Sequence, residues 1–494
     1  YYGLPFAQPP IGDLRWRAPV PIESGPKSVD IINATAPGFQ CMQGGTAWQP
    51  AVVPTTGQPT GGGLGFPGTS TPLVTNEDCL RLDVFVPNKP KSSSLPVIFA
   101  IHGGGYTGGN SAGFPGETFV KWSEGSVVFV SIQYRLGALG FLGGSGITSD
   151  GTANVGLLDQ RLALQWVQKH IAAFGGDPAK VTMWGQSAGA GSITEQLIMY
   201  GGEAKPPFRA AIAEWPGVLP HKSNQALERQ YQHFLDAGNC KDLACLRKIN
   251  LKDLDTVIQK AANVSYSRGE HGYGDFWWSP YVDGKIIPDI SSKALARGAF
   301  SKVPLLTSRN SFEGTFFADP NVTTEAGIRK NFAALFQLPA NDPLPEEVLK
   351  QYPLASFSGS YFNHPFFTAI GDCFIVCPTS YLNIAASKAN SPNWKLNFDA
   401  SIYLHGATAL YTLGDSALTP SAVTAQLLKS YYLAFVVNMD PNAEAGAPYA
   451  LRPQWSQYGT DSKVLQIDDL WVNTKTDTMV TVLAVNGGLR RWIK

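Results

Sequence analysis

The chain has 494 residues with 38 basic and 38 acidic side chains, so it carries no net charge. This balance excludes the long-range field with which basic proteins recruit nucleic acid or an anionic membrane, and a small-molecule partner is expected instead. Charged residues make up only 15% while Gly (51) and Pro (36) are abundant, which is typical of a loop-rich globular protein. We find no apolar run near the roughly 18 to 20 residues that cross a bilayer, so we predict no stable membrane insertion.

The first residues, YYGLPFAQPPIGDLRWR, look like a segment from within a folded domain. We therefore expect a signal peptide and some mature residues to precede them. The chain shows no linker and no internal repeat. One elaborated domain over 1–494 is thus preferred to the two to four domains that the length alone allows.

Residues 42–78 form the next distinct region, which is rich in Gly, Pro and Thr and nearly free of charge. Cysteines flank it at Cys41 and Cys79. A bond between these two cysteines would make 41–79 a tethered loop over the site rather than a linker.

Six apolar runs end in glycine or polar turns, and near-continuous apolarity is typical of strands buried on both faces. They cover residues 80–87, 95–105, 126–135, 180–187, 209–215 and 302–310. Residues 156–176 have helical spacing and close with Gly175 and Gly176. Strands that alternate with helices predict an α/β fold, a mainly parallel sheet covered on both faces, with function at the carboxyl ends of the strands. The partly helical segments at about 220–300 and 325–390 are expected to be insertions that cap the sheet.

The pattern GQSAG places Ser187 between two glycines, after a β-prone run and before a small-residue run that opens a helix. A strand that reverses sharply into a helix strains the turning residue and leaves room only for hydrogen at its neighbours. This G-x-S-x-G turn is typical of the nucleophile of an α/β-hydrolase. The run IHGGGYTGGN supplies backbone N–H groups for an oxyanion, so Gly104, Gly105 and Ala188 are the predicted donors.

In such folds an acid and then a histidine follow the serine along the chain. The five histidines after Ser187 are His221, His233, His271, His364 and His405. We favour His405 because it lies in a glycine-flanked turn after the strand-like WKLNF, whereas His233 and His364 have the setting of surface or packing residues. For the acid we favour Glu313, a few residues after the strand VPLLTS, over its rivals Asp289 and Asp319.

The other four cysteines fall into close pairs, Cys240 with Cys245 and Cys373 with Cys377, and we expect a bond between Cys373 and Cys377. Glycosylation sequons begin at Asn33, Asn263 and Asn321. An even cysteine count together with sequons indicates a secreted, extracellular protein. No cysteine has the paired C-x-x-C spacing of a zinc site, so we predict no metal, and the serine chemistry needs no cofactor.

With these residues placed, the chain resembles the type-B carboxylesterase and cholinesterase family, particularly its fungal carboxylesterase and lipase members. The resemblance covers most of the chain and rests on GLPFAQPPIGDLRWRAP, NEDCLRLDVFVP, HGGGYTGG, NVGLLDQRLALQWVQKHIAAFGGDPAKVTMWGQSAGAGS, SRNSFEG, GDCFIVCP and HGATALYTLG. It implies an α/β-hydrolase fold in which Ser187 is the nucleophile, His405 the general base and Glu313 the orienting carboxylate. It also implies the oxyanion donors Gly104, Gly105 and Ala188, the bonds Cys41–Cys79 and Cys240–Cys245, and an ion pair between Arg15 and Glu77. The Cys373–Cys377 bond lies outside the family pattern.

Departures from the family pattern bear on the substrate. The position three residues after His405 is commonly acidic in the family, and here it is Thr408. Trp215 stands in AEWPG, where many members have Ser-Gly-Ser, so we expect the Trp215 side chain to narrow the pocket. Gln186 replaces the glutamate that cholinesterases carry before the serine, which argues against a cholinesterase. Residues 42–78 lack the amphipathic periodicity of a lipase lid. The aromatic runs at 276–278 and 366–370 either line an apolar acyl or aryl pocket or pack in the core.

These observations predict a secreted serine carboxylesterase that hydrolyses short-chain or aryl esters through an acyl-enzyme intermediate. A triacylglycerol lipase or sterol esterase for long acyl chains is the alternative. A catalytically silent binding or adhesion ectodomain is the alternative of another class, against which the presence of all three candidate catalytic residues argues. The predicted partner is a small-molecule ester.

Overall fold

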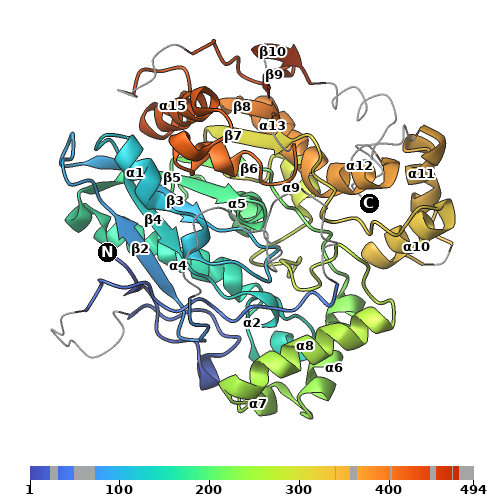
Figure 1. Ribbon diagram of the computed structural model, residues 1–494. Helices are drawn as coiled ribbons and strands as arrows, with labels where there is room; N and C mark the ends of the chain where they lie inside the picture. Colours follow the sequence, from blue (N-terminus) through green and yellow to red (C-terminus); the bar gives the residue numbers. More distant parts are fainter. Residues whose placement is uncertain are drawn as a thin grey trace.

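The computed structural model describes residues 1–22, 32–48, 73–339, 341–356, 364–400, 403–445, 452–469 and 471–477 (Figure 1). The predicted 42–78 loop falls largely outside them, since 49–72 are not described.

The described residues contain one ten-stranded sheet with the order β1-β2-β4-β3-β5-β6-β7-β8-β9-β10. Pairing is parallel from β4 through β9, while β1, β2 and β10 join at the two sides by antiparallel pairing. The strands are β1 Leu4–Pro5, β2 Arg81–Phe85, β3 Leu95–Ile101, β4 Val128–Ile132, β5 Gly176–Gln186, β6 Ala210–Glu214, β7 Leu305–Asn310, β8 Asn393–Asp399, β9 Lys463–Asp468 and β10 Val472–Thr476. All six predicted apolar runs contain strands, and the predicted α/β-hydrolase class is confirmed.

Helices cover both faces of the sheet (Figure 1). They are α1 Gly116–Trp122, α2 Gly137–Phe141, α3 Ser145–Asp150, α4 Val155–His170, α5 Ala188–Ile198, α6 Asn224–Ala237, α7 Leu243–Leu246, α8 Leu251–Ser267, α9 Ser291–Ala296, α10 Glu325–Leu335, α11 Leu344–Gln351, α12 Pro365–Gly371, α13 Cys377–Lys388, α14 Ala409–Thr412 and α15 Ala422–Asn438. Short 3₁₀ turns lie at Gly12–Leu14, Ser111–Gly113, Ile171–Phe174, Met199–Gly201, Leu354–Ser356 and Ser416–Leu418, and a π-helical turn, η8, spans Asp372–Val376. The helix predicted at 156–176 is α4 with a final 3₁₀ turn, and it ends at Gly175 with φ +78°.

Alternate side chains of the central strand β3 point to opposite faces and enter two separate cores. Phe99 and Ile101 belong to the larger core, which also contains the apolar side chains of α4 and α5. Ile98 and Ala100 belong to the second core, under α1 and α15. The central strands β3, β4 and β6 are fully buried, and the candidate site lies at the carboxyl-terminal edge of this part of the sheet.

The continuous helical stretch Pro365–Lys388, formed by α12, η8 and α13, is long and apolar enough to cross a membrane by length and composition. It has 24 residues, and 72% of its apolar window is buried inside the protein. Its last part, α13, packs against β7, β8 and α9. This burial is what a core helix shows, so the stretch is weak evidence for a membrane span.

The structure contains the Cys41–Cys79 and Cys240–Cys245 disulfides, but the predicted Cys373–Cys377 bond is wrong. Both of these cysteines are free and lie four residues apart where η8 runs into α13. Side chains four apart on a helix share a face but keep their Cβ atoms about 5–6 Å apart, whereas a disulfide needs about 3.8 Å. Closeness in the sequence therefore did not provide the geometry of a bond.

Candidate active site

Ser187 lies at the turn between β5 and α5, with φ +54° and ψ −121°. A Cβ atom on Gly185 would stand 2.4 Å from the carbonyl oxygen of Gly189, and one on Gly189 would stand 2.0 Å from that of Ile101. Both distances are below any real contact, so only glycine fits on either side of the serine. The strained turn thus presents Ser187, which is 7% exposed, at the carboxyl end of the sheet.

Glu313 and His405 follow neighbouring parallel strands and meet beside Ser187. Glu313 comes three residues after β7, and His405 comes six residues after β8. The loops stay aligned beyond the strands, because the Phe312 N–H donates to the Tyr403 carbonyl at 2.8 Å. His405 Nδ1 lies 2.5 Å from Glu313 Oε2, and His405 Nε2 lies 2.8 Å from Ser187 Oγ. The three predicted side chains therefore form one hydrogen-bonded chain, in which each ring nitrogen of the imidazole has its own partner.

Asn310, the last residue of β7, holds Glu313 in place. Its backbone N–H and its side-chain amide both donate to Glu313 Oε1, at 2.5 and 3.1 Å. Its own Oδ1 accepts from the backbone N–H and the hydroxyl of Thr408, at 3.3 and 2.7 Å. Thr408, at the position where the family commonly has an acid, thus links the His405 loop to the Glu313 loop. Asn310 carries no signal in the sequence, because only the fold brings it to these partners.

The remaining candidates have partners outside the chain that links Glu313, His405 and Ser187. The exposed pair Asp289 and Arg297 forms an ion pair, while Asp319 Oδ1 accepts hydrogen bonds within its own loop from Asn321. The other downstream histidines have partners of their own. His221 contacts Glu195 at 3.2 Å, and His233 contacts Glu270 at 2.5 Å. His271 stacks on Trp277, while His364 is the N-cap of α12 and accepts from the Phe366 N–H. His233 and His364 are buried, so packing rather than the surface describes them. No group of three or more His, Cys, Asp or Glu within the described ranges is arranged to hold a metal ion.

The residues Gly103–Gly109, here called the glycine strip, fold tightly behind Ser187. The Gly104 carbonyl accepts the N–H groups of Thr107 and Gly108 at 3.1 and 2.9 Å. Gly104 and Gly105 have φ of +111° and +63°, and a Cβ on Gly105 would stand 2.0 Å from the Phe276 ring. Glycine is therefore required at both positions by conformation as well as by space.

A cleft with about 260 Å³ of empty space lies over Ser187. Its walls combine the predicted donor sites Gly105 and Ala188 with four aromatic residues, and Gly104 is not among its lining residues. The cleft is lined by Gly105, Tyr106, Ser187, Ala188, Gly217, Leu219, Phe276, Phe317, Phe374 and Ile375. Ala188 is the first residue of α5, where the N–H has no partner within the helix.

The aromatic residues singled out in the sequence divide between this wall and the core. Phe276 lines the cleft, whereas Trp277 and Trp278 are buried in the larger core. Phe366 and Phe367 are core residues too. Trp215 is fully buried with its ring edge-on to His405 at 6.1 Å, and it is not among the cleft's lining residues in the described part of the chain. It therefore packs behind the imidazole instead of narrowing the cleft.

Glu214, which no sequence pattern marks, lies directly behind the turn. Its backbone carbonyl accepts the Ser187 N–H at 3.1 Å, and its fully buried carboxylate accepts from Trp184, Gln186 and Tyr432 at 2.7–2.8 Å. Burial raises the pKa of Glu214 to about 7, although the three hydrogen bonds oppose the rise. Gln186 thus supports the turn through the hydrogen bond that its side-chain amide donates to this carboxylate.

His102, directly before the glycine strip, gives a testable pH dependence. Its ring stacks on Tyr134 at 4.5 Å and is 3% exposed, and burial lowers its pKa to about 4 from an ordinary 6.5. Between pH 4 and pH 6.5 the unfolded chain therefore binds more protons than the folded protein does. The unfolding free energy consequently falls as the pH drops from 6.5 to 4. Between pH 8 and pH 5 we expect His102 to account for a loss of about 2 kcal/mol.

Urea unfolding of the wild type and of His102→Asn at both pH values checks this prediction. The asparagine amide can still donate to the Gly103 carbonyl, which His102 Nδ1 contacts at 2.8 Å. Glu214 changes the unfolding free energy with pH in the opposite direction between pH 4.5 and 7. The loss of unfolding free energy from pH 8 to pH 5 must therefore be compared between the wild type and the variant. Equal losses in both proteins would contradict the prediction.

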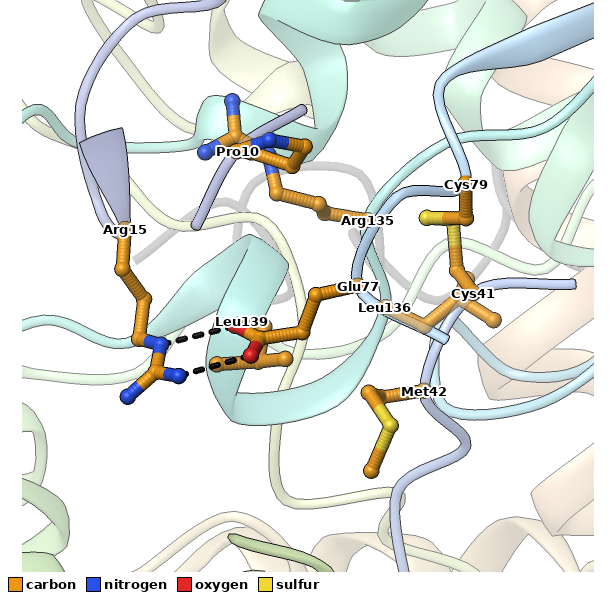
Figure 2. A pocket seen from close by; sticks show the side chains of 9 residues that line it. All are labelled: Pro10, Arg15, Cys41, Met42, Glu77, Cys79, Arg135, Leu136 and Leu139. Atoms are coloured by element: carbon orange, nitrogen blue, oxygen red, sulfur yellow. Dashed lines mark hydrogen bonds and ion pairs between the residues drawn. A yellow bond between two sulfur atoms is a disulfide. The ribbon is translucent and has the colours of Figure 1, made fainter. Parts of the chain in front are cut away.

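The base of the tethered loop is fixed by a buried ion pair and a disulfide. Figure 2 shows Arg15 facing Glu77 beside the Cys41–Cys79 bond, and their closest atoms are 2.6 Å apart. Arg15 also donates to the Leu246 carbonyl at 2.9 Å. The ion pair implied by the family resemblance is therefore present, and it ties the N-terminal segment to the loop and to α7.

Comparisons with known proteins agree with this geometry. A model of the carboxylesterase family matches residues 1–481. The secreted lipase 1 of Botryotinia fuckeliana is 35% identical over 94% of this chain and 85% of that protein, and the carboxylesterase patB of Aspergillus clavatus is 31% identical over 90% and 85%. The crystal structure of Aspergillus niger EstA matches with a TM-score of 0.84 and 27% identity over 100% of this chain and 95% of that one. The chain belongs to the type-B carboxylesterase and lipase family and is a carboxylic ester hydrolase.

Proposed function

We propose that Ser187, His405 and Glu313 are the catalytic triad of this esterase. The observation that carries the proposal is the hydrogen-bonded chain from Glu313 through His405 to Ser187, which ends at a cleft. His405 Nε2 takes the hydroxyl proton as Ser187 Oγ attacks the ester carbonyl, and Glu313 stabilises the imidazolium that forms. His405 then protonates the departing alcohol, and water repeats these steps to release the acid from the acyl-enzyme.

The oxyanion of each tetrahedral intermediate is held by the N–H groups of Gly104, Gly105 and Ala188. Two observations support this assignment. Gly105 and Ala188 line the cleft beside Ser187, and neither Gly104 nor Gly105 donates its N–H to another backbone group within the described ranges. One donor of this kind contributes roughly 100- to 1000-fold in rate.

The cleft favours a short acyl or an aryl group. The rings of Phe276, Phe317 and Phe374 form its wall, and they give it the apolar surface that such a group would contact. The main alternative is a lipase for long acyl chains, because several relatives are named lipases. The segments 220–300 and 325–390 supply Phe276 and Phe374, which supports their assignment as cap insertions.

Hydrolysis of p-nitrophenyl esters from acetate to palmitate and of methyl ferulate, each with and without an organophosphate, tests the proposal. We expect inhibitor-sensitive turnover that peaks at short or aryl esters. A peak at long chains would favour the lipase alternative. Complete absence of turnover would contradict the esterase and favour a binding ectodomain.

The wall residue Phe374 gives a sharper prediction on chain length. We expect Phe374→Ala to raise kcat/KM for p-nitrophenyl octanoate relative to acetate about tenfold, since each added methylene is worth roughly 1–3 kcal/mol in an apolar pocket. Phe336→Ala is the matched control, because Phe336 is half-buried and stacks on Phe332 instead of lining the cleft. An unchanged ratio in Phe374→Ala would remove this ring from the specificity wall.

We also propose that the protein is secreted and glycosylated. Two fungal relatives are named as secreted lipases, and the side chains of Asn33, Asn263 and Asn321 are all exposed. The Thr35 hydroxyl donates to Asn33 Oδ1 at 2.7 Å, which brings the acceptor and hydroxyl residues of that sequon together. We expect peptide-N-glycosidase to lower the mass of the protein when it is purified from the culture medium of the organism that makes it. An unchanged mass would contradict glycosylation.

A further inference from the structure

The root of the disulfide-tethered loop lies against the back of the glycine strip. Gln43 makes the contact: its Oε1 accepts the Gly109 N–H at 2.8 Å, and its Nε2 donates to the Gly109 carbonyl at 3.2 Å. One side chain thus satisfies both backbone polar groups of Gly109, as a neighbouring strand would. Gln43 is not among the lining residues of the cleft, so it does not meet the substrate there.

Movement of Gly109 would pass directly to the proposed oxyanion donors. The strip folds back on itself, since the Gly104 carbonyl accepts the Gly108 N–H. A Cβ on Gly109 would stand 2.3 Å from the Gly103 carbonyl oxygen, and one on Gly104 would stand 2.1 Å from that of Gly108. The two limbs of the strip are therefore in backbone contact, with no side chain between them to absorb a shift.

The segment that carries Gln43 is itself fixed at both ends. Cys41 is bonded to Cys79, just ahead of β2, and its carbonyl accepts Gln43 Nε2 at 2.7 Å. Farther along, the Gly44 N–H donates to the Thr107 carbonyl at 2.5 Å. Trp48 is buried, and its indole N–H donates to the Asp275 carbonyl at 2.6 Å.

We propose that Gln43 is a positioning residue that holds the glycine strip in the geometry of the oxyanion hole. The inference rests on the proposed function, because it assigns Gln43 a role toward the N–H groups of Gly104 and Gly105. A displacement of about 1 Å at a reacting centre can cost a hundredfold in rate. Loss of this anchor should weaken the binding of the tetrahedral oxyanion and leave the binding of the planar ester unchanged.

The test uses Gln43→Met, which keeps the length of the side chain and removes its hydrogen bonds. We expect kcat for p-nitrophenyl acetate to fall about tenfold with KM within twofold of wild type. An alkyl trifluoromethyl ketone binds the serine as a tetrahedral oxyanion, so its affinity should fall by the same factor as kcat. Gln168→Met is the matched control, because Gln168 is also half-buried and donates to two backbone carbonyls, those of Pro178 and Pro207.

Unchanged kcat and inhibitor affinity in Gln43→Met would overturn the inference. So would a fall in kcat without a matching fall in inhibitor affinity, or an equal fall in Gln168→Met, since these outcomes indicate general destabilisation. Ser187→Ala is measured in parallel to separate the two proposals. If Ser187→Ala is inactive and Gln43→Met is normal, only the positioning role fails; if Ser187→Ala retains turnover, the proposed function fails.

Discussion

Ser187→Ala is expected to lower kcat/KM for p-nitrophenyl acetate by about 10⁴- to 10⁶-fold, because the loss of a serine nucleophile leaves only the catalysis of the oxyanion site. The variant should fold. The hydrogen bond that Ser187 Oγ shares with His405 is the contact removed, and alanine tolerates the same small space between Gly185 and Gly189. We expect its unfolding free energy to stay within about 1 kcal/mol of wild type.

The measurement combines initial rates, urea unfolding and mass spectrometry after treatment with paraoxon. Wild type should gain one diethylphosphoryl group on the peptide that contains Ser187, and the variant should gain none. Ser192→Ala is the control, because Ser192 is buried on α5, the helix that follows Ser187, accepts from Gln160 at 2.9 Å and is not among the residues that line the cleft. Retained turnover in a folded Ser187→Ala protein would remove Ser187 from the mechanism.

The turn around Ser187 was predictable because its requirements are local. Steric demands on Gly185 and Gly189 leave a readable pattern, and the structure gives the reason in the close approach of Ile101 and Gly189. His405 and Glu313 could be chosen from their rivals because a parallel sheet brings the ends of its strands together. In each case chain order or local spacing already contained the information.

The supporting contacts were not predictable, since they join side chains that are distant along the chain. Asn310 touches Thr408 across 98 positions, and Gln43 touches Gly109 across 66. No spacing or composition marks such a pair. The buried Glu214 was missed for the same reason, because its three donors come from two other elements.

Local patterns also misled where the backbone departs from regular geometry. The closeness of Cys373 and Cys377 suggests a bond, yet both residues lie in one helical stretch that runs from Pro365 to Lys388. The π-helical turn η8 directly precedes α13, and Pro378 falls in the first turn of that helix, where proline's missing N–H is tolerated. The continuous helix then holds Cys373 and Cys377 on one face without bringing their sulfurs into bonding geometry.

Glu313→Gln should lower kcat by about 10³- to 10⁴-fold with a smaller change in KM, since an amide in place of a triad carboxylate selects the wrong imidazole tautomer. Asn310 fixes how the amide would lie. Its backbone N–H and Nδ2 both donate to Glu313 Oε1, so the glutamine must present its carbonyl oxygen there and turn its NH₂ group toward His405 Nδ1. The imidazole would then accept at Nδ1 and carry its proton on Nε2, where it faces Ser187 and cannot act as a base.

Steady-state kinetics on Glu313→Gln, Glu313→Asp and Asp319→Asn measures this effect. Glu313→Asp keeps the negative charge but places it one methylene farther from the imidazole. We therefore expect its kcat to lie between those of the wild type and Glu313→Gln. Asp319→Asn makes the same change from acid to amide at the rival position, whose carboxylate contacts its own loop, and its kcat should stay near wild type. A tenfold or smaller loss in a folded Glu313→Gln protein would show that another group orients His405.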